Sequence, residues 1–123
     1  GETGAEEWLV PATTLDELIV HRLQPADRVL LKLDLEGHEL EALAGARRLL
    51  PRVEVLLTEV QFYEIERNGL PTFADVAAAV AREGFVLGDV AGLAARPRDG
   101  RLRMGDVIFV RHDSPLRQDD AWA

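Results

Sequence analysis

The pattern of apolar and polar positions along the 123-residue chain separates expected strands from expected helices. Nearly continuous aliphatic runs predict strands, whereas apolar residues spaced three and four apart predict amphipathic helices. The expected strands cover residues 7–14, 28–34, 53–60, 85–90 and 104–111. The expected helices cover residues 15–23, residues 39–50 and the stretch between Thr72 and Gly84.

Local signals set the ends of these helices. The stretch Thr14-Leu-Asp-Glu17 has the spacing of a capping box, in which the hydroxyl accepts an early helix N–H and Glu17 reaches back. Pro51 ends the second helix because proline cannot donate a backbone hydrogen bond. Thr72 is placed to cap the third helix, and Gly84 to end it.

Alternation of strands with helices predicts an α/β fold with a mostly parallel sheet. The short turn at residues 96–101 leaves no room for a crossover helix, so the last strand is expected to be antiparallel. Residues 1–112 are expected to form this domain, and residues 113–123 a polar tail.

Composition narrows the classes of function. The formal net charge of −8 disfavours nucleic acid and anionic membrane surfaces as partners. No apolar run approaches the ~20 residues of a membrane span and the first residues do not resemble a signal peptide, so a cytoplasmic location is expected. Cysteine is absent and the single serine, Ser114, lies in the tail, which disfavours a hydrolase.

The most informative segment is Lys32-Leu-Asp-Leu-Glu-Gly-His38, in which charges and leucines alternate. In an extended strand Lys32, Asp34 and Glu36 would share one face. Ligands of open α/β sheets bind at the carboxyl ends of strands, where Asp34, Glu36 and His38 fall. This places a candidate site here. The alternative is structural, with a Lys32–Asp34 ion pair and Glu36 capping the next helix.

A second candidate group follows the next strand. Glu59 and Gln61 end residues 53–60, so parallel pairing would bring Glu59 to the same sheet edge as Asp34. Alternatively, Glu59 is a solvated residue at the end of the strand, and the sequence favours neither interpretation. Asp106, at the start of an antiparallel strand, could also face this edge, but it is interpreted as closing a turn. No metal site is expected, because no second histidine or carboxylate cluster completes a ligand shell.

Three stretches resemble the FkbM family of S-adenosylmethionine-dependent methyltransferases, and together they span most of residues 10–111. They are Thr13-Thr-Leu-Asp-Glu-Leu18, Leu31-Lys-Leu-Asp-Leu-Glu-Gly-His-Glu-Leu-Glu-Ala-Leu-Ala-Gly-Ala46 and Gly105-Asp-Val-Ile-Phe-Val-Arg111. The resemblance implies the later strands of a class I, Rossmann-like methyltransferase sheet. It also implies S-adenosylmethionine as cofactor and a small metabolite or sugar hydroxyl as methyl acceptor.

In the family this chain resembles, the strands that bind the cofactor come first, so they are expected upstream of Gly1. The chain is then the C-terminal half of a domain, inactive alone and dependent on an N-terminal half in cis. Residues 28–34 would form a leucine-rich sheet edge, which predicts instability or self-association into a homo-oligomer.

The resemblance assigns roles by position. The catalytic candidates are Asp34, Glu36 and His38, and the substrate-binding candidates are Lys32, Glu59 and Gln61. His38 is the favoured base because the pKa of histidine is ordinarily nearest neutrality, with Glu36 next. The alternative is a non-catalytic remnant of the same fold that binds a partner.

Overall fold

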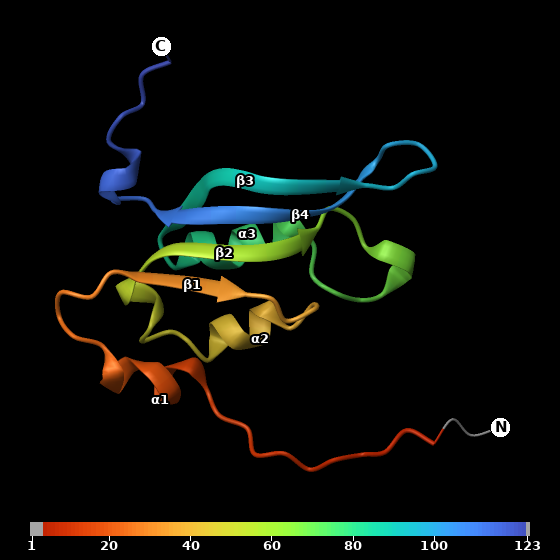
Figure 1. Cartoon of the computed structure of the whole chain (residues 1–123), viewed down its shortest axis with the longest axis horizontal. Helices are drawn as coiled ribbons and strands as arrows, with labels where there is room; N and C mark the ends of the chain where they lie inside the picture. Colours follow the sequence, from red (N-terminus) through yellow and green to blue (C-terminus); the bar gives the residue numbers. More distant parts are fainter. Residues whose placement is uncertain (1–3, 123) are drawn as a thin grey trace.

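The computed structural model describes residues 4–122 and shows a four-stranded sheet with helices packed on one face (Figure 1). None of the helices in this range has the length and apolar character to cross a membrane. The elements in chain order are α1 (Leu15–Ile19), β1 (Val29–Leu33), α2 (Glu39–Ala44), β2 (Val53–Gln61), α3 (Phe73–Arg82), β3 (Phe85–Ala95) and β4 (Leu102–Arg111).

The sheet has the strand order β1-β2-β4-β3. β1 pairs with β2 in parallel, and β4 is antiparallel to both of its neighbours. β1, β2 and β3 therefore run in the same direction and β4 is reversed, which confirms the expected mixed α/β sheet. The carboxyl ends of β1 and β2 meet at one edge, next to the turn between β3 and β4 (Figure 1).

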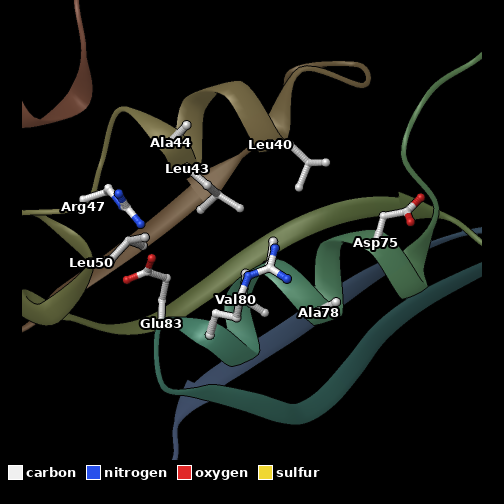
Figure 2. A pocket seen from close by; sticks show the side chains of 11 residues that line it. Leu40, Leu43, Ala44, Arg47, Leu50, Asp75, Ala78, Val80 and Glu83 are labelled. Atoms are coloured by element: carbon white, nitrogen blue, oxygen red, sulfur yellow. The ribbon is translucent and has the colours of Figure 1, made fainter.

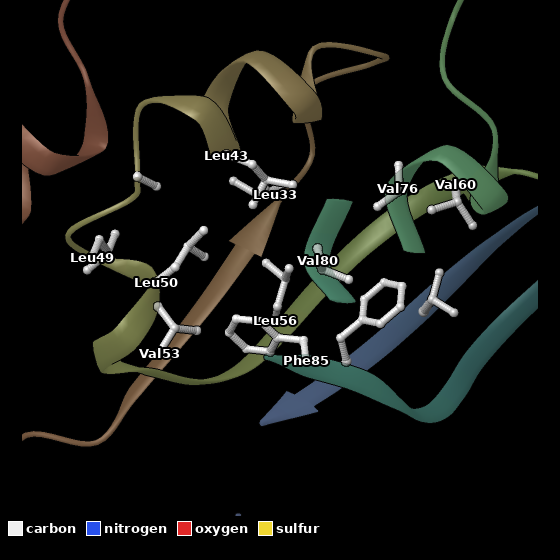
Figure 3. Packing of buried hydrophobic residues seen from close by; sticks show 13 residues of the cluster. Leu33, Leu43, Leu49, Leu50, Val53, Leu56, Val60, Val76, Val80 and Phe85 are labelled. Carbon is white, nitrogen blue, oxygen red and sulfur yellow. The ribbon is translucent and has the colours of Figure 1, made fainter. Parts of the chain in front are cut away.

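The core lies between the sheet and helices α2 and α3 (Figure 3). Leu56 at the centre of β2 is fully buried, and Leu43 of α2 and Val80 of α3 pack in the same cluster. Leu33 and Phe109 extend this cluster onto β1 and β4. Each such side chain contributes roughly 1.5–3 kcal/mol of burial free energy, so this face holds the domain together.

The opposite face of the sheet is more open. Lys32, Leu57 and Ile108 form one row across β1, β2 and β4, and none of the three is buried. β1 is an edge strand, and the side chain of Leu30 on it is 62% exposed. The expectation of a leucine-rich edge at residues 28–34 is therefore confirmed.

Two expected elements differ from the structure. Residues 7–14 are irregular, because the segment pairs with no strand of the described chain. The helix expected over residues 39–50 ends at Ala44. The Asp16 carboxylate accepts the backbone N–H groups of Arg48 (3.0 Å) and Leu49 (2.7 Å), so these donors bond across to α1 instead of continuing the helix.

The predicted helix caps at Thr14 and Thr72 are confirmed, except for the bond that Glu17 was expected to accept. Thr14 accepts the N–H of Glu17 at 3.1 Å, although the Glu17 carboxylate takes the hydroxyl of Thr13 instead of the Thr14 backbone. Thr72 and Asp75 form a complete capping box at the start of α3. Gly84 follows α3 with a φ of +87°, as a helix-ending glycine does.

The segment after β4 is partly docked. Ser114 is 5% exposed, and its hydroxyl donates to the Glu54 carboxylate at 3.2 Å. A short 3₁₀ turn, Pro115–Arg117, follows it. The polar tail expected from residue 113 onward therefore begins with an anchored turn.

Candidate functional site

The segment after β1 leaves the strand conformation earlier than its alternation predicts. β1 ends at Leu33, and Glu36 and Gly37 have φ angles of +50° and +103°. Lys32 and Asp34 still line one pocket together, whereas Glu36 turns away and lines another. The predicted common face is thus correct for Lys32 and Asp34 and wrong for Glu36, because the left-handed turn breaks the period of two.

This turn is held by Glu39, a residue absent from the predicted site. Its side chain is 4% exposed, and its carboxylate accepts the backbone N–H groups of Leu35 and Gly37, each at 3.0 Å. Hydrogen bonds to a charged acceptor are stronger than neutral ones. The signal for it in the sequence is an acidic residue two positions after a turn glycine, at the first position of α2.

The first pocket of the site is the carboxylate pocket, with a volume of about 340 Å³. It lies at the carboxyl ends of β1 and β2, and its charged lining residues are Lys32, Asp34, Glu59 and Asp106. Glu59 of β2 stands directly opposite Asp106 of β4 in the antiparallel register. The expected meeting of Glu59 and Asp34 at one edge is confirmed. The interpretation of Asp106 as a turn residue is wrong, because it lies within β4 and faces this pocket.

The carboxyl group of Glu59 is the most perturbed group of this pocket. Partial burial raises its pKa above the ordinary 4.5, and the negative charges of Asp106 and Asp34 raise it further. Glu39 and Glu36 add to the same effect. Crowding of carboxylates thus gives Glu59 a greater affinity for a proton than an isolated glutamate has.

The second pocket, the edge pocket, adjoins the first and has a volume of about 390 Å³. Glu59 lines both pockets. Leu70, Pro71 and Met104 give the edge pocket an apolar part, and Glu36 adds a charge. A substrate that spans both pockets would therefore meet carboxylates at one end and apolar surface at the other.

Gln61 supports the loop that forms one side of the edge pocket. Its side-chain amide donates to Asn68 Oδ1 (3.1 Å) and to the Leu70 carbonyl (2.8 Å). Its carbonyl oxygen accepts the Asn68 amide at 2.9 Å. Gln61 is buried, so its polar groups position the loop. Direct contact of Gln61 with a substrate stays a prediction.

His38 lies outside both pockets. Its side chain is 72% exposed, and its nearest charged neighbour is Glu41, with 3.8 Å between Nδ1 and Oε1. It stands immediately before α2, on the solvent side of the turn that carries Glu36. Its role as a base stays a prediction, and the geometry brings Asp34 and Glu59 together without it.

A larger pocket of about 510 Å³ lies between α2 and α3 (Figure 2). Its lining is mainly aliphatic, with Leu40, Leu43 and Val80 among the residues, and it carries charges at Arg47 and Glu83. None of the predicted site residues lines it. The predicted site residues thus lie at the sheet edge and not between α2 and α3.

The acidic groups do not form a metal cage. In the part of the chain that the structure covers, no group of three or more histidine or acidic side chains is arranged to hold a metal ion. The carboxylate pocket also contains the Lys32 ammonium, which competes with a cation for the same oxygen atoms.

Comparison with known proteins identifies the family. A search of curated proteins found no match to the chain. The family model described as the methyltransferase FkbM domain matches residues 2–87, which include β1, α2, β2 and α3. The match contains the segment from Lys32 to His38 and Glu59, whereas residues 105–111 lie beyond it. With this match over more than half of its length, the chain belongs to the FkbM methyltransferase family.

Proposed function

We propose that the protein is an S-adenosylmethionine-dependent methyltransferase that methylates a hydroxyl group of a small metabolite or sugar. The observation that carries this proposal is the opposed pair Glu59 and Asp106, beside Asp34, at the carboxyl edge of a sheet from a methyltransferase family. Open α/β sheets bind ligands at this edge. The reversed strand β4 supports the further proposal that these strands are the later ones of a class I sheet.

The acidic sheet edge fits the sulfonium end of the cofactor. S-adenosylmethionine supplies an electrophilic methyl group on a positively charged sulfur. Asp34, Glu36, Glu59 and Asp106 make this edge strongly acidic, which suits a cationic group.

Methylation of a hydroxyl requires a proton acceptor. The acceptor oxygen bonds to the methyl carbon, the carbon–sulfur bond breaks with its electron pair left on sulfur, and the hydroxyl proton is released. Glu59 is our choice of base, because its raised pKa makes its carboxylate a stronger proton acceptor than an ordinary glutamate. A general base contributes typically 10²–10⁴-fold to the rate.

The other residues orient the acceptor. Lys32 lines the same pocket, and its ammonium is suited to donate a hydrogen bond to an acceptor oxygen. Asp34 and Asp106 are suited to accept hydrogen bonds from neighbouring hydroxyls, as a sugar would offer. Alignment of this kind contributes to rate by holding the reacting oxygen in line with the methyl group.

The test is methyl transfer by the intact protein from isotopically labelled S-adenosylmethionine to a panel of sugars and small alcohols, followed by mass spectrometry. The Glu59→Gln variant should lose roughly 10²-fold or more in kcat. The matched control is Glu83→Gln, at the far end of α3, which should retain full turnover.

Two further variants separate the candidate bases. Loss of turnover in His38→Ala, together with full turnover in Glu59→Gln, would assign the base to His38 and overturn the role of Glu59. Retained turnover in His38→Ala and Glu36→Gln would leave Glu59 as the base. An intact protein that binds no S-adenosylmethionine would contradict the proposal and favour the non-catalytic alternative.

A further inference from the structure

The turn between β3 and β4 is rich in basic residues, whereas the protein as a whole is acidic. The chain has a net charge of −8, yet residues 96–103 contain four arginines and one aspartate. We call Arg98, Arg101 and Arg103 together with Tyr63 the arginine turn. Arg98, Arg101 and Arg103 are exposed. Guanidinium groups gathered in this way create a local positive potential that attracts anions.

The single aspartate of this segment is already fully engaged. Asp99 holds Arg96 through two hydrogen bonds, 2.6 Å from Nε and 2.5 Å from Nη2, and it also accepts the backbone N–H of Arg101 at 3.0 Å. The backbone N–H of Arg96 donates to the Arg101 carbonyl at 2.9 Å, which closes the turn. Among the residues that the structure describes, no carboxylate forms a salt bridge with Arg98, Arg101 or Arg103.

An aromatic ring fixes one of these guanidinium groups. Arg101 Cζ lies 4.0 Å from the centroid of the Tyr63 ring, and Arg96 Cζ lies 5.8 Å from the same centroid. Tyr63 is half-buried in the loop after β2. Stacking covers one face of the planar guanidinium and leaves its N–H edge available for a bidentate contact. The side chain is thereby ordered before any anion arrives.

The arginine turn lies close to the candidate site. The backbone N–H of Phe62 donates to the Arg103 carbonyl at 2.9 Å, and Met104, which lines the edge pocket, pairs with Gln61. Side chains alternate along a strand, so Arg103, three residues from Asp106, leaves the opposite face of β4. Arg103 directly precedes Met104 of the edge pocket, and Glu59 lines the same pocket, so the edge pocket connects the arginine turn with Glu59.

We propose that the arginine turn binds a phosphate group on the methyl acceptor, so that the acceptor is a sugar phosphate or a phosphate ester of similar size. This inference rests on the proposed function, because it places the hydroxyl end of the same molecule at Glu59, which lines both the edge pocket and the carboxylate pocket. Guanidinium groups recognise phosphate by paired N–H···O hydrogen bonds. The adjacent carboxylates and the overall charge of −8 disfavour an extended polyanion such as a nucleic acid.

The experiment measures anion binding to the intact protein by calorimetry, with no S-adenosylmethionine present. The probes are inorganic pyrophosphate, glucose 1-phosphate and glucose. The triple variant Arg98→Gln, Arg101→Gln and Arg103→Gln should bind both phosphate probes roughly tenfold or more weakly than the wild type. The variant with the same charge change at Arg22, Arg48 and Arg82, which are exposed residues elsewhere, should stay within about twofold.

A conservative variant gives an independent readout. Arg101→Lys keeps the charge but loses the planar contact with Tyr63, so it should weaken pyrophosphate binding and leave the thermal unfolding midpoint unchanged. Equal weakening in the control triple variant would show a general charge effect and overturn the inference. Absence of phosphate binding by the wild type, or binding of glucose as tight as that of glucose 1-phosphate, would also overturn it.

The result of this binding experiment can be distinguished from the result of the methyl-transfer test. Binding of pyrophosphate at the arginine turn is measured without the cofactor, so a failure of methyl transfer leaves this result intact. Methylation of neutral sugars at rates equal to those of their phosphates would overturn the acceptor class while supporting methyl transfer itself.

Discussion

Gly37 lies so close to Leu70 that a Cβ atom on the glycine would come within 2.6 Å of Leu70 Cδ2. The two residues belong to different loops, one after β1 and one after β2. Both line the edge pocket. The contact therefore fixes the width of this pocket, and it links the characteristic Glu36-Gly37 turn to the loop that Gln61 supports.

Substitution of Gly37 by alanine should destabilise the fold by about 1–3 kcal/mol, since it adds both a steric clash and backbone strain at a φ of +103°. Urea unfolding measures this. Gly69→Ala is the matched control, because Gly69 has a φ of +70° with no atom within 4 Å of an added Cβ. A larger loss at Gly37 than at Gly69 isolates the Leu70 contact, and equal losses would contradict it.

Removal of the Glu39 carboxylate should cost about 2–3 kcal/mol in the free energy of unfolding. The substitution Glu39→Ala leaves the N–H groups of Leu35 and Gly37 without their charged acceptor in a partly buried turn. Chemical denaturation checks this, with Glu41→Ala on the exposed face of α2 as the control. A stability loss no greater than that of the control would show that Glu39 does not hold the turn.

Stability should depend on pH through Glu59. Because its folded-state pKa is raised above the ordinary 4.5, the folded protein binds more protons than the unfolded chain between that value and the raised one. Stability from this group is therefore fully present below pH 4.5 and is lost as the pH rises through the raised pKa. Glu59→Gln should remove this loss, so the variant should be more stable than the wild type near neutral pH.

Unfolding midpoints measured between about pH 4 and pH 8 test this dependence. The Glu83→Gln control should follow the wild-type curve. A Glu59→Gln variant that is less stable than the wild type at neutral pH would show that the Glu59 charge is compensated in the folded state.

Charge on the exposed edge strand should reduce self-association. Leu30 is 62% exposed on β1, whose outer side pairs with no strand of the described chain, so such an edge is a template for pairing with another copy. Leu30→Lys should shift the sedimentation profile toward the monomer. Leu18→Lys, on the 45% exposed position of α1, is the control. A wild type that sediments as a monomer at all concentrations would contradict the expectation.

Much of the fold was predictable because its elements carry strong local patterns. The aliphatic runs of β1, β2 and β4 and the capping box at Thr72 are readable without tertiary information. The end of α2 was not, because the Asp16 carboxylate takes the donors at Arg48 and Leu49 from more than thirty residues away in the chain. A tertiary hydrogen bond of this kind leaves no periodic signal.

Part of the candidate site was also predictable from the sequence. The carboxyl ends of parallel strands must meet, so Asp34 and Glu59 were placed together correctly. Asp106 was considered for this edge but was interpreted as a turn residue, because its position depends on the antiparallel register with β2, which the sequence does not specify. The burial of Glu39 also depends on the loop geometry around Gly37 and not on its own neighbours in sequence.

The position of β4 has a consequence for the order in which the protein forms. β4 lies between β2 and β3, so nothing joins these two strands within the sheet until residues 102–111 are added. A nascent chain that ends before them leaves β3 unpaired and the sheet in two pieces. The same strand delivers Asp106 opposite Glu59. Closure of the sheet and completion of the carboxylate pocket therefore depend on the same strand.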